Sequence, residues 1–211
     1  MLAFDMNKPN PIFTWPETDP NTPPQKPEDL DRVARELWEA YLGPFRRPRP
    51  RVSTIFQGAE QHMIPTPGGA VAAWRIGEGP AVMMMHGYFD DHTLWTPLIR
   101  KLLDEGRSAV AFDLPGHGLS DGDHSTLRYG TDAALAVAKT LGPVEAMVGH
   151  SLGGLIVAQA CVEGLAVKRA VIIGTTTYRS KRLAGMAAQH GLGADVIERV
   201  RELHGEAFGA I

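Results

Sequence analysis

The sequence predicts an α/β fold built on a mostly parallel β-sheet with helices on both faces. From about residue 60 onward, short apolar segments alternate with helical patterns, as in chains that build parallel sheets from βαβ units. Residues 80–85, Pro-Ala-Val-Met-Met-Met, are almost continuously apolar, which is typical of a strand buried on both faces. A second apolar segment, 144–149, runs directly into a helical pattern, so strand and helix meet there within a few residues.

The individual elements follow from local patterns. Residues 60–65 and 70–76 flank a Pro-Thr-Pro-Gly-Gly sequence and predict a hairpin-like pair of strands. Leucines at helical spacing predict a helix over 93–105. The remaining apolar and helical patterns predict strands at 108–113 and 168–174 and helices at 128–141 and 152–164.

The chain divides into three segments by composition. Ten of its 16 prolines lie in residues 1–50, which we interpret as an N-terminal extension with one amphipathic helix near residues 28–41. We expect Leu37 and Trp38 of that helix to pack on the main domain. Residues 51–178 form the α/β core, and residues 179–211 form two helical stretches separated by Gly191 and Gly193.

Composition excludes several classes of protein. The 21 basic and 24 acidic residues give a net charge of −3, which is not typical of nucleic-acid binding. The single cysteine, Cys161, cannot form an internal disulfide. No apolar run is long enough to span a membrane, and the first residues lack a signal-peptide pattern. We therefore expect a cytoplasmic protein that contacts neither nucleic acid nor membrane.

One short motif indicates chemistry. Residues 149–153 read Gly-His-Ser-Leu-Gly, with an apolar strand before them and a helix after them, the setting in which a G-x-S-x-G motif is informative. The strand-to-helix turn would expose Ser151 at the carboxyl end of the sheet. The beginning of the following helix would direct backbone N–H groups toward negative charge. The alternative is an ordinary serine that caps the helix.

Two further motifs establish a family resemblance. His86-Gly87-Tyr88 follows the strand at 80–85, and Asp113-Leu-Pro-Gly-His-Gly-Leu-Ser120 follows the strand at 108–113. With the Ser151 motif, these residues resemble the α/β-hydrolase family, in its serine-nucleophile, esterase/lipase-like branch, over roughly residues 60–178. Branches that open epoxides or haloalkanes place Asp at the nucleophile position. Ser151 therefore implies ester-type acyl chemistry.

The resemblance implies roles for individual residues. Ser151 would be the nucleophile of an acyl-enzyme mechanism, and the backbone N–H groups of Tyr88 and Leu152 would form the oxyanion hole. The substrate pocket would be lined by Phe89, Trp95 and His150, under a helical cap that begins in residues 179–211. His86 would be a structural donor behind the oxyanion loop. Neither a cofactor nor a metal is implied, and the expected partner is a small acyl substrate.

The acid and the histidine of a catalytic triad are not identified. In this family they follow the serine in the order acid, then histidine, and only 60 residues follow Ser151. We therefore expect a C-terminally truncated hydrolase that is inactive as this chain alone. Its strand 168–174 would be an apolar edge open to self-association. A non-catalytic binding module and one part of a split enzyme stay open as alternatives. The unsupported candidates for the acid and the base are Asp195, Glu198, Glu202, Glu206, His92, His124, His190 and His204.

Overall fold

The structure is a computed structural model, which describes residues 22–43, 53–175 and 180–208. The chain forms two compact units, one of residues 43–175 and one that combines residues 1–42 with 176–211. The boundaries expected at residues 50 and 178 lie outside the described residues, and the division into three segments stays a prediction.

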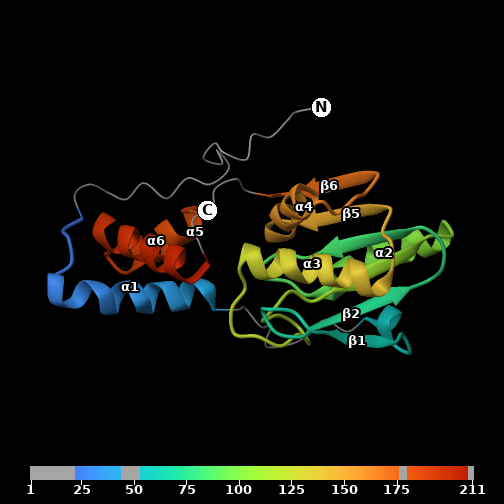
Figure 1. Cartoon of the computed structure of the whole chain (residues 1–211), viewed down its shortest axis with the longest axis horizontal. Helices are drawn as coiled ribbons and strands as arrows, with labels where there is room; N and C mark the ends of the chain where they lie inside the picture. Colours follow the sequence, from blue (N-terminus) through green and yellow to red (C-terminus); the bar gives the residue numbers. More distant parts are fainter. Residues whose placement is uncertain (1–21, 44–52, 176–179, 209–211) are drawn as a thin grey trace. The chain divides into compact units, whose positions relative to one another are not determined.

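A six-stranded sheet forms the centre of the first unit, in the order β1-β2-β4-β3-β5-β6 (Figure 1). Strands β1, β2 and β4 pair antiparallel, and β4, β3, β5 and β6 pair parallel. The expected mostly parallel sheet is therefore confirmed. The strand bounds are β1 Gln61–Ile64, β2 Val71–Ile76, β3 Ala81–Met85, β4 Ser108–Phe112, β5 Ala146–His150 and β6 Arg169–Ile173.

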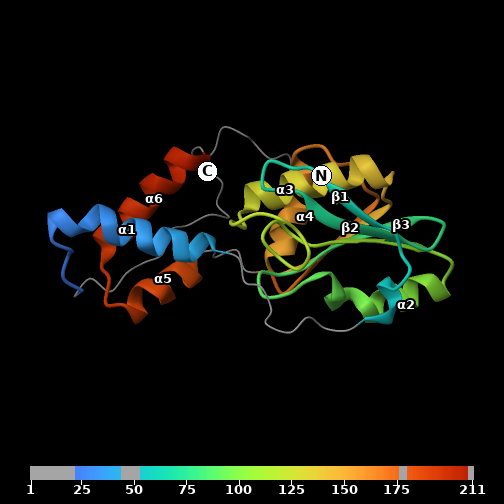
Figure 2. The ribbon, with the colours of Figure 1, turned by 90° about the horizontal axis from the view of Figure 1, so that it is seen from below.

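Helices cover both faces of this sheet, also as expected. Figure 2 shows α3 (Leu127–Leu141) and α4 (Leu152–Val162) on one face and α2 (Thr96–Asp104) on the other. The short helix η2 (His92–Trp95) leads into α2. Alternate residues of the strands serve the two layers, so that Val82 and Met84 of β3 pack with Ile99 of α2. All five residues of β3 are buried, which explains the unbroken apolar run in its sequence.

Strand β6 forms one edge of the sheet and pairs only with β5 among the described strands. All five of its residues are exposed. Val171, Ile172 and Ile173 each expose between 46% and 49% of their surface. The apolar edge expected from the sequence is therefore present.

The second unit consists of three helices, α1 (Pro27–Leu42), α5 (Ser180–Gln189) and α6 (Ala194–Phe208). Leu37 of α1 is buried with Leu183 of α5 and Val200 of α6. Trp38 packs against the same cluster. The expectation that Leu37 and Trp38 pack on the sheet domain was therefore wrong, because α5 and α6 supply the apolar surface that they cover.

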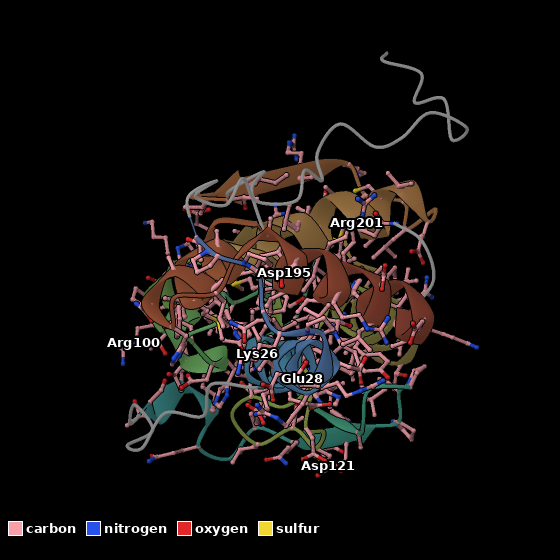
Figure 3. The ribbon with its side chains drawn as sticks, turned by 90° about the vertical axis from the view of Figure 1, so that its left-hand side faces the viewer. Lys26, Glu28, Arg100, Asp121, Asp195 and Arg201 are labelled. Carbon is pink, nitrogen blue, oxygen red and sulfur yellow. The ribbon has the colours of Figure 1, made fainter. Side chains whose placement is uncertain are left out.

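Polar contacts also join the ends of the sequence within this unit. The backbone N–H of Gln25 donates to Asp195 Oδ2 over 2.5 Å. Figure 3 shows Asp195, at the beginning of α6, and Lys26, which directly precedes α1. Arg199 donates to Asp31 and holds α6 against α1. Among the described helices of both units, none is long and apolar enough to cross a membrane.

Candidate active site

Ser151 occupies the turn between β5 and α4 in an unusual backbone conformation. Its φ is 53° and its ψ is −117°, and it is the one described non-glycine residue with positive φ. Such a conformation costs on the order of 1–3 kcal/mol and persists only where surrounding structure holds it. Ser151 makes no side-chain capping hydrogen bond to α4, so its interpretation as an ordinary helix cap is wrong.

Three glycines make room for this turn. A Cβ on Gly149 would lie 2.2 Å from the Gly153 carbonyl oxygen, and one on Gly153 would lie 2.1 Å from the Met85 carbonyl oxygen. A Cβ on Gly154 would overlap the Thr175 hydroxyl. The glycines of the motif therefore allow backbone to pack directly on backbone where α4 begins beside β3 and β5.

Strand β6 holds the turn from its other side. The Ser151 N–H donates to the Ile173 carbonyl oxygen over 2.9 Å, and the Thr175 hydroxyl donates to the Ser151 carbonyl oxygen over 2.9 Å. The contact between Thr175 and Ser151 was not predicted from the sequence. Its one signal in the sequence is the glycine at position 154, where a side chain would overlap the Thr175 hydroxyl. The Ser151 peptide groups are therefore held on the N–H side by Ile173, the last residue of β6, and on the carbonyl side by Thr175, two residues beyond it.

The loop after β3 borders Ser151. A Cβ on Gly87 would lie 3.1 Å from the Ser151 Cβ, so this part of the loop runs alongside the serine. Tyr88 follows in the same loop. Within the described residues, the Leu152 N–H at the beginning of α4 donates no hydrogen bond. The proposed oxyanion donors Tyr88 and Leu152 thus belong to the two segments that meet at Ser151.

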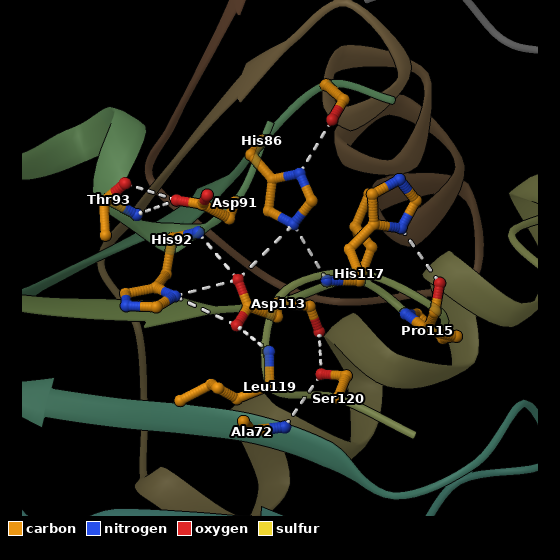
Figure 4. Close-up of polar contacts among 12 residues, drawn as sticks. Ala72, His86, Asp91, His92, Thr93, Asp113, Pro115, His117, Leu119 and Ser120 are labelled. Carbon is orange, nitrogen blue, oxygen red and sulfur yellow. Dashed lines mark hydrogen bonds and ion pairs between the residues drawn. The ribbon is translucent and has the colours of Figure 1, made fainter. Parts of the chain in front are cut away.

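His86 sits directly behind this loop and is completely buried. Its Nδ1 lies 2.7 Å from the Gly87 carbonyl oxygen, and its Nε2 lies 3.0 Å from the Leu114 N–H (Figure 4). A carbonyl oxygen only accepts and an N–H only donates, so the ring is neutral with its proton on Nδ1. Burial, with the neighbouring His117, lowers the pKa of His86 to about 4. His86 is therefore a hydrogen-bond donor behind the loop, as the sequence predicted.

Asp113, at the end of β4, is the buried acceptor of this region (Figure 4). It accepts from the backbone N–H of His92 over 2.7 Å, from His92 Nδ1 over 2.9 Å and from the Leu119 N–H over 2.9 Å. Burial acts to raise its pKa, but the hydrogen bond and charge of His92 outweigh it and hold the pKa below the usual value. Asp113 therefore organises two loops as a carboxylate.

His92 does not serve Ser151 in this arrangement. Its ring packs on Trp74 of β2, with centroids 4.2 Å apart. Strands β4 and β3 lie between β2 and β5, so β2 and β5 are about 14 Å apart at ordinary strand spacing. The Nδ1 atom of His92 is hydrogen-bonded to Asp113. His124 lies in the loop between β4 and α3.

The residues expected to line a pocket lie in different surroundings. Phe89 is 56% exposed, and His150 is partly exposed with its Nδ1 3.9 Å from Asp90 Oδ2. Trp95 is buried in the core with Ile99 and Leu102 of α2. The pocket roles of Phe89, His150 and Trp95 stay predictions.

Within the described residues, no side chain forms a hydrogen bond to the Ser151 hydroxyl. The α6 carboxylates Glu202 and Glu206 pair with Arg199, and Glu198 pairs with Arg201. His204 is buried within the helical unit, and His190 is exposed there. No group of three or more His, Cys, Asp or Glu in the described part of the chain is arranged to hold a metal ion.

A cavity of about 660 Å³ lies at the opposite end of the strands. It is lined by the segments that precede β3, β5 and β6, whereas Ser151 follows β5. Its cations are already engaged, because Arg75 donates to the Leu141 carbonyl oxygen and Lys168 pairs with Glu145. The cavity is therefore separate from the Ser151 site.

The sheet order, the strained serine turn and its glycines together define an α/β hydrolase. The model of the Alpha/beta hydrolase family matches residues 82–209, more than half of the chain. The protein belongs to this family.

Among curated proteins, the chain is 34% identical over 101 residues to the pimeloyl-[acyl-carrier protein] methyl ester esterase of Xanthomonas campestris pv. campestris. That match covers 48% of this chain and 39% of the relative. An esterase of Mycobacterium tuberculosis is 34% identical over 128 residues, 57% of this chain and 42% of the relative. The chain therefore spans about two fifths of the length of these curated relatives.

Solved structures agree on the fold. An esterase of Pyrococcus furiosus matches with a TM-score of 0.53 and 22% identity over 61% of this chain and 56% of that one. The epoxide hydrolase of Vigna radiata matches with a TM-score of 0.50 and 26% identity over 58% of this chain and 39% of that one. Proteins of different chemistry thus share this sheet, so the fold does not by itself assign the reaction.

Proposed function

We propose that this protein is a serine hydrolase that acts on a carboxylic ester or related small acyl substrate through an acyl-enzyme on Ser151. The observation that carries the proposal is the positive φ of Ser151 at the carboxyl end of β5. A binding scaffold has no need of a strained serine, whereas a nucleophile needs its hydroxyl raised above the sheet. The esterase names of the curated relatives support the same reaction class.

In the proposed mechanism, Ser151 Oγ attacks the ester carbonyl carbon while a general base accepts the hydroxyl proton. The tetrahedral oxyanion is bound by the backbone N–H groups of Leu152 and Tyr88, each contributing about 3 kcal/mol to the stability of the transition state. The intermediate collapses, and the leaving alkoxide takes up the proton. Attack by water on the acyl-enzyme then releases the acid and restores Ser151.

The proton acceptor sets the expected rate. No described side chain is hydrogen-bonded to Ser151 Oγ, and removal of the base from a serine–histidine pair costs a factor of about 10⁶ in turnover. We therefore propose that the 211-residue chain alone turns over esters barely above the background rate. Acylation by an activated ester, which needs little base assistance, is the step to measure.

A stopped assay with p-nitrophenyl acetate tests the proposal. The chain should release no more than about one equivalent of p-nitrophenol in the acylation phase, with the acetyl group recovered on the peptide that contains Ser151. Ser151→Ala should remove this phase. Ser125→Ala is the matched control, since the Ser125 hydroxyl is buried and without a hydrogen bond in the described structure. Equal acylation of the wild type and Ser151→Ala would contradict the proposal.

The Ser151 hydroxyl, which has no hydrogen-bond partner among the described side chains, also supports a second candidate: a hydrolase-fold module that binds a ligand or completes its site with a second chain. The two candidates differ in their response to Ser151→Ala. A binding module retains ligand affinity in this variant and shows no acylation in the wild type. A split enzyme gains turnover when the complementing chain is added.

A further inference from the structure

Two successive peptide carbonyls of the loop beside Ser151 are each held by an imidazole ring. His86 Nδ1–H donates to the Gly87 carbonyl oxygen over 2.7 Å, and His117 Nε2 lies 2.7 Å from the Tyr88 carbonyl oxygen. The two rings pack edge to face with centroids 5.2 Å apart. His86 comes from the loop itself, whereas His117 comes from the loop after β4.

The hydrogen-bond partners of His117 differ in kind from those of His86. His117 Nδ1 lies 3.0 Å from the Pro115 carbonyl oxygen (Figure 4), so both ring nitrogens face carbonyl oxygens. A carbonyl oxygen only accepts, and a neutral imidazole has a single N–H. The imidazolium form alone satisfies both contacts. A neutral ring would direct a lone pair at a carbonyl oxygen in a fully buried place.

The charged groups around His117 are compatible with a buried cation. The carboxylate of Asp113, directly after β4, lies 3.9 Å from His86 Nε2. The His86 ring in turn packs against the His117 ring, so His86 contacts both groups. His86 is neutral by its hydrogen bonds. The other titratable groups described in this region include Tyr88, whose ring packs edge-on against His117, Asp90 in the same loop, and Asp91 and His92 at η2. Burial opposes the charge on His117, and two charge-assisted hydrogen bonds offset that cost.

We infer that His117 is held as an imidazolium that clamps the loop beside Ser151, and that it is a positioning residue for the peptide groups proposed to bind the oxyanion. His117 fixes the Tyr88–Phe89 peptide, and His86 fixes the preceding Gly87–Tyr88 peptide, which carries the Tyr88 N–H. The role in oxyanion binding rests on the proposed function. The protonated state and the clamping of the loop stand on the contacts alone.

The protonated state is tested by NMR of the whole chain with ¹⁵N-labelled histidine at pH 7.5. An ordinary histidine, with a pKa of about 6.5, is mostly neutral at this pH. His117 should instead show two ring nitrogens with similar, protonated-type shifts, while His86 shows the well-separated shifts of a neutral ring protonated on Nδ1. The His117→Phe variant assigns the signal. A neutral pattern for His117 in the wild type overturns the inference, whether or not the variant folds.

The clamp is tested by amide hydrogen exchange of Tyr88 and Phe89. Loss of a buried hydrogen bond at the Tyr88 carbonyl should speed exchange in this loop about tenfold in His117→Phe. His117→Gln retains one amide donor and should lie between the variant and the wild type. His62→Phe on β1 is the control and should exchange like the wild type. Unchanged loop exchange in folded His117→Phe overturns the clamp. If Ser151 proves unreactive while His117 is an imidazolium, the proposed function is contradicted but the clamping role of His117 is not.

Discussion

Ser151 is the residue at which local backbone energy and proposed chemistry meet. Its side chain makes no capping hydrogen bond, so its hydroxyl adds nothing to the stability of α4, while its positive φ destabilises the fold. Removal of the hydroxyl and relief of the strain are therefore separable by two substitutions at one position.

We predict that Ser151→Gly is more stable than Ser151→Ala by about 1–3 kcal/mol, because glycine adopts positive φ without strain. In an ordinary first turn of a helix, the free energies of unfolding of the two variants would differ far less. Urea unfolding monitored by circular dichroism measures the difference. A Ser151→Ala protein as stable as Ser151→Gly would show that the turn is unstrained.

His86 predicts a particular dependence of stability on pH. The folded-state pKa is about 4 against an ordinary value of about 6.5, so the unfolded chain binds more protons between these values. The free energy of unfolding should therefore fall by up to about 3 kcal/mol as the pH is lowered from 6.5 to 4.

His86→Gln should lack the His86 part of this loss, and unfolding curves at several pH values measure it. Below the ordinary value of 3.8, protonation of Asp113, whose folded-state pKa is lowered, should destabilise both proteins further. Identical pH profiles for the wild type and His86→Gln would contradict the buried neutral state of His86.

At the scale of elements, the strand-to-helix turn from β5 to α4 depends on glycines that have no room for a side chain. We predict that Gly153→Ala destabilises the fold by several kcal/mol, because its Cβ would lie 2.1 Å from the Met85 carbonyl oxygen. Gly185→Ala in α5 is the matched control, since outside the backbone of its own helix no described atom beyond its chain neighbours lies within 4 Å of the added Cβ. That change should stabilise the helix by up to about 1 kcal/mol. Thermal unfolding of both variants tests the contrast, and equal effects would contradict it.

The strands and helices of the core were predicted from the sequence within a few residues, because each leaves a local signature. The apolar run at 80–85 and the glycines around Ser151 are such signatures. The burial of Trp95 and the contact of Thr175 with Ser151 depend on segments distant in the sequence. Side-chain direction at such contacts is set by the assembled sheet, so no periodicity reveals it.

The packing of α1 was predicted wrongly for the same reason, because it too depends on segments distant in the sequence. Its apolar stripe indicated that α1 packs on another element, but a stripe does not name its partner. In the structure, Leu37 packs with Leu183 and Val200, which lie more than 140 residues later in the sequence. The motif at Ser151 was predictable because its function requires a local sequence. A triad acid and base, which come from separate elements, leave no such local pattern.

At the scale of the whole molecule, the exposed edge of β6 is the feature that bears on association. Val171 and Ile173 lie on an edge strand that pairs on one side only among the described strands, and their apolar side chains are exposed. We predict that the chain self-associates through this edge and that Val171→Lys shifts the equilibrium toward the monomer, because charge on an edge strand opposes pairing. Met63→Lys, on an exposed position of β1, is the control.

Sedimentation at increasing protein concentration measures this equilibrium. The wild type and Met63→Lys should form larger species, and Val171→Lys should remain smaller at the same concentration. A wild-type chain that stays monomeric throughout the series would contradict association through β6.

If Ser151 is a nucleophile that the fold holds in a reactive position, a fluorophosphonate should react with it covalently. Prolonged incubation at high probe concentration compensates for a slow reaction, and intact-mass and peptide analysis locate the adduct. We expect a single adduct on the peptide that contains Ser151, absent in Ser151→Ala and retained in Ser125→Ala. No adduct, or an adduct that persists in Ser151→Ala, would contradict the role of Ser151 as a nucleophile.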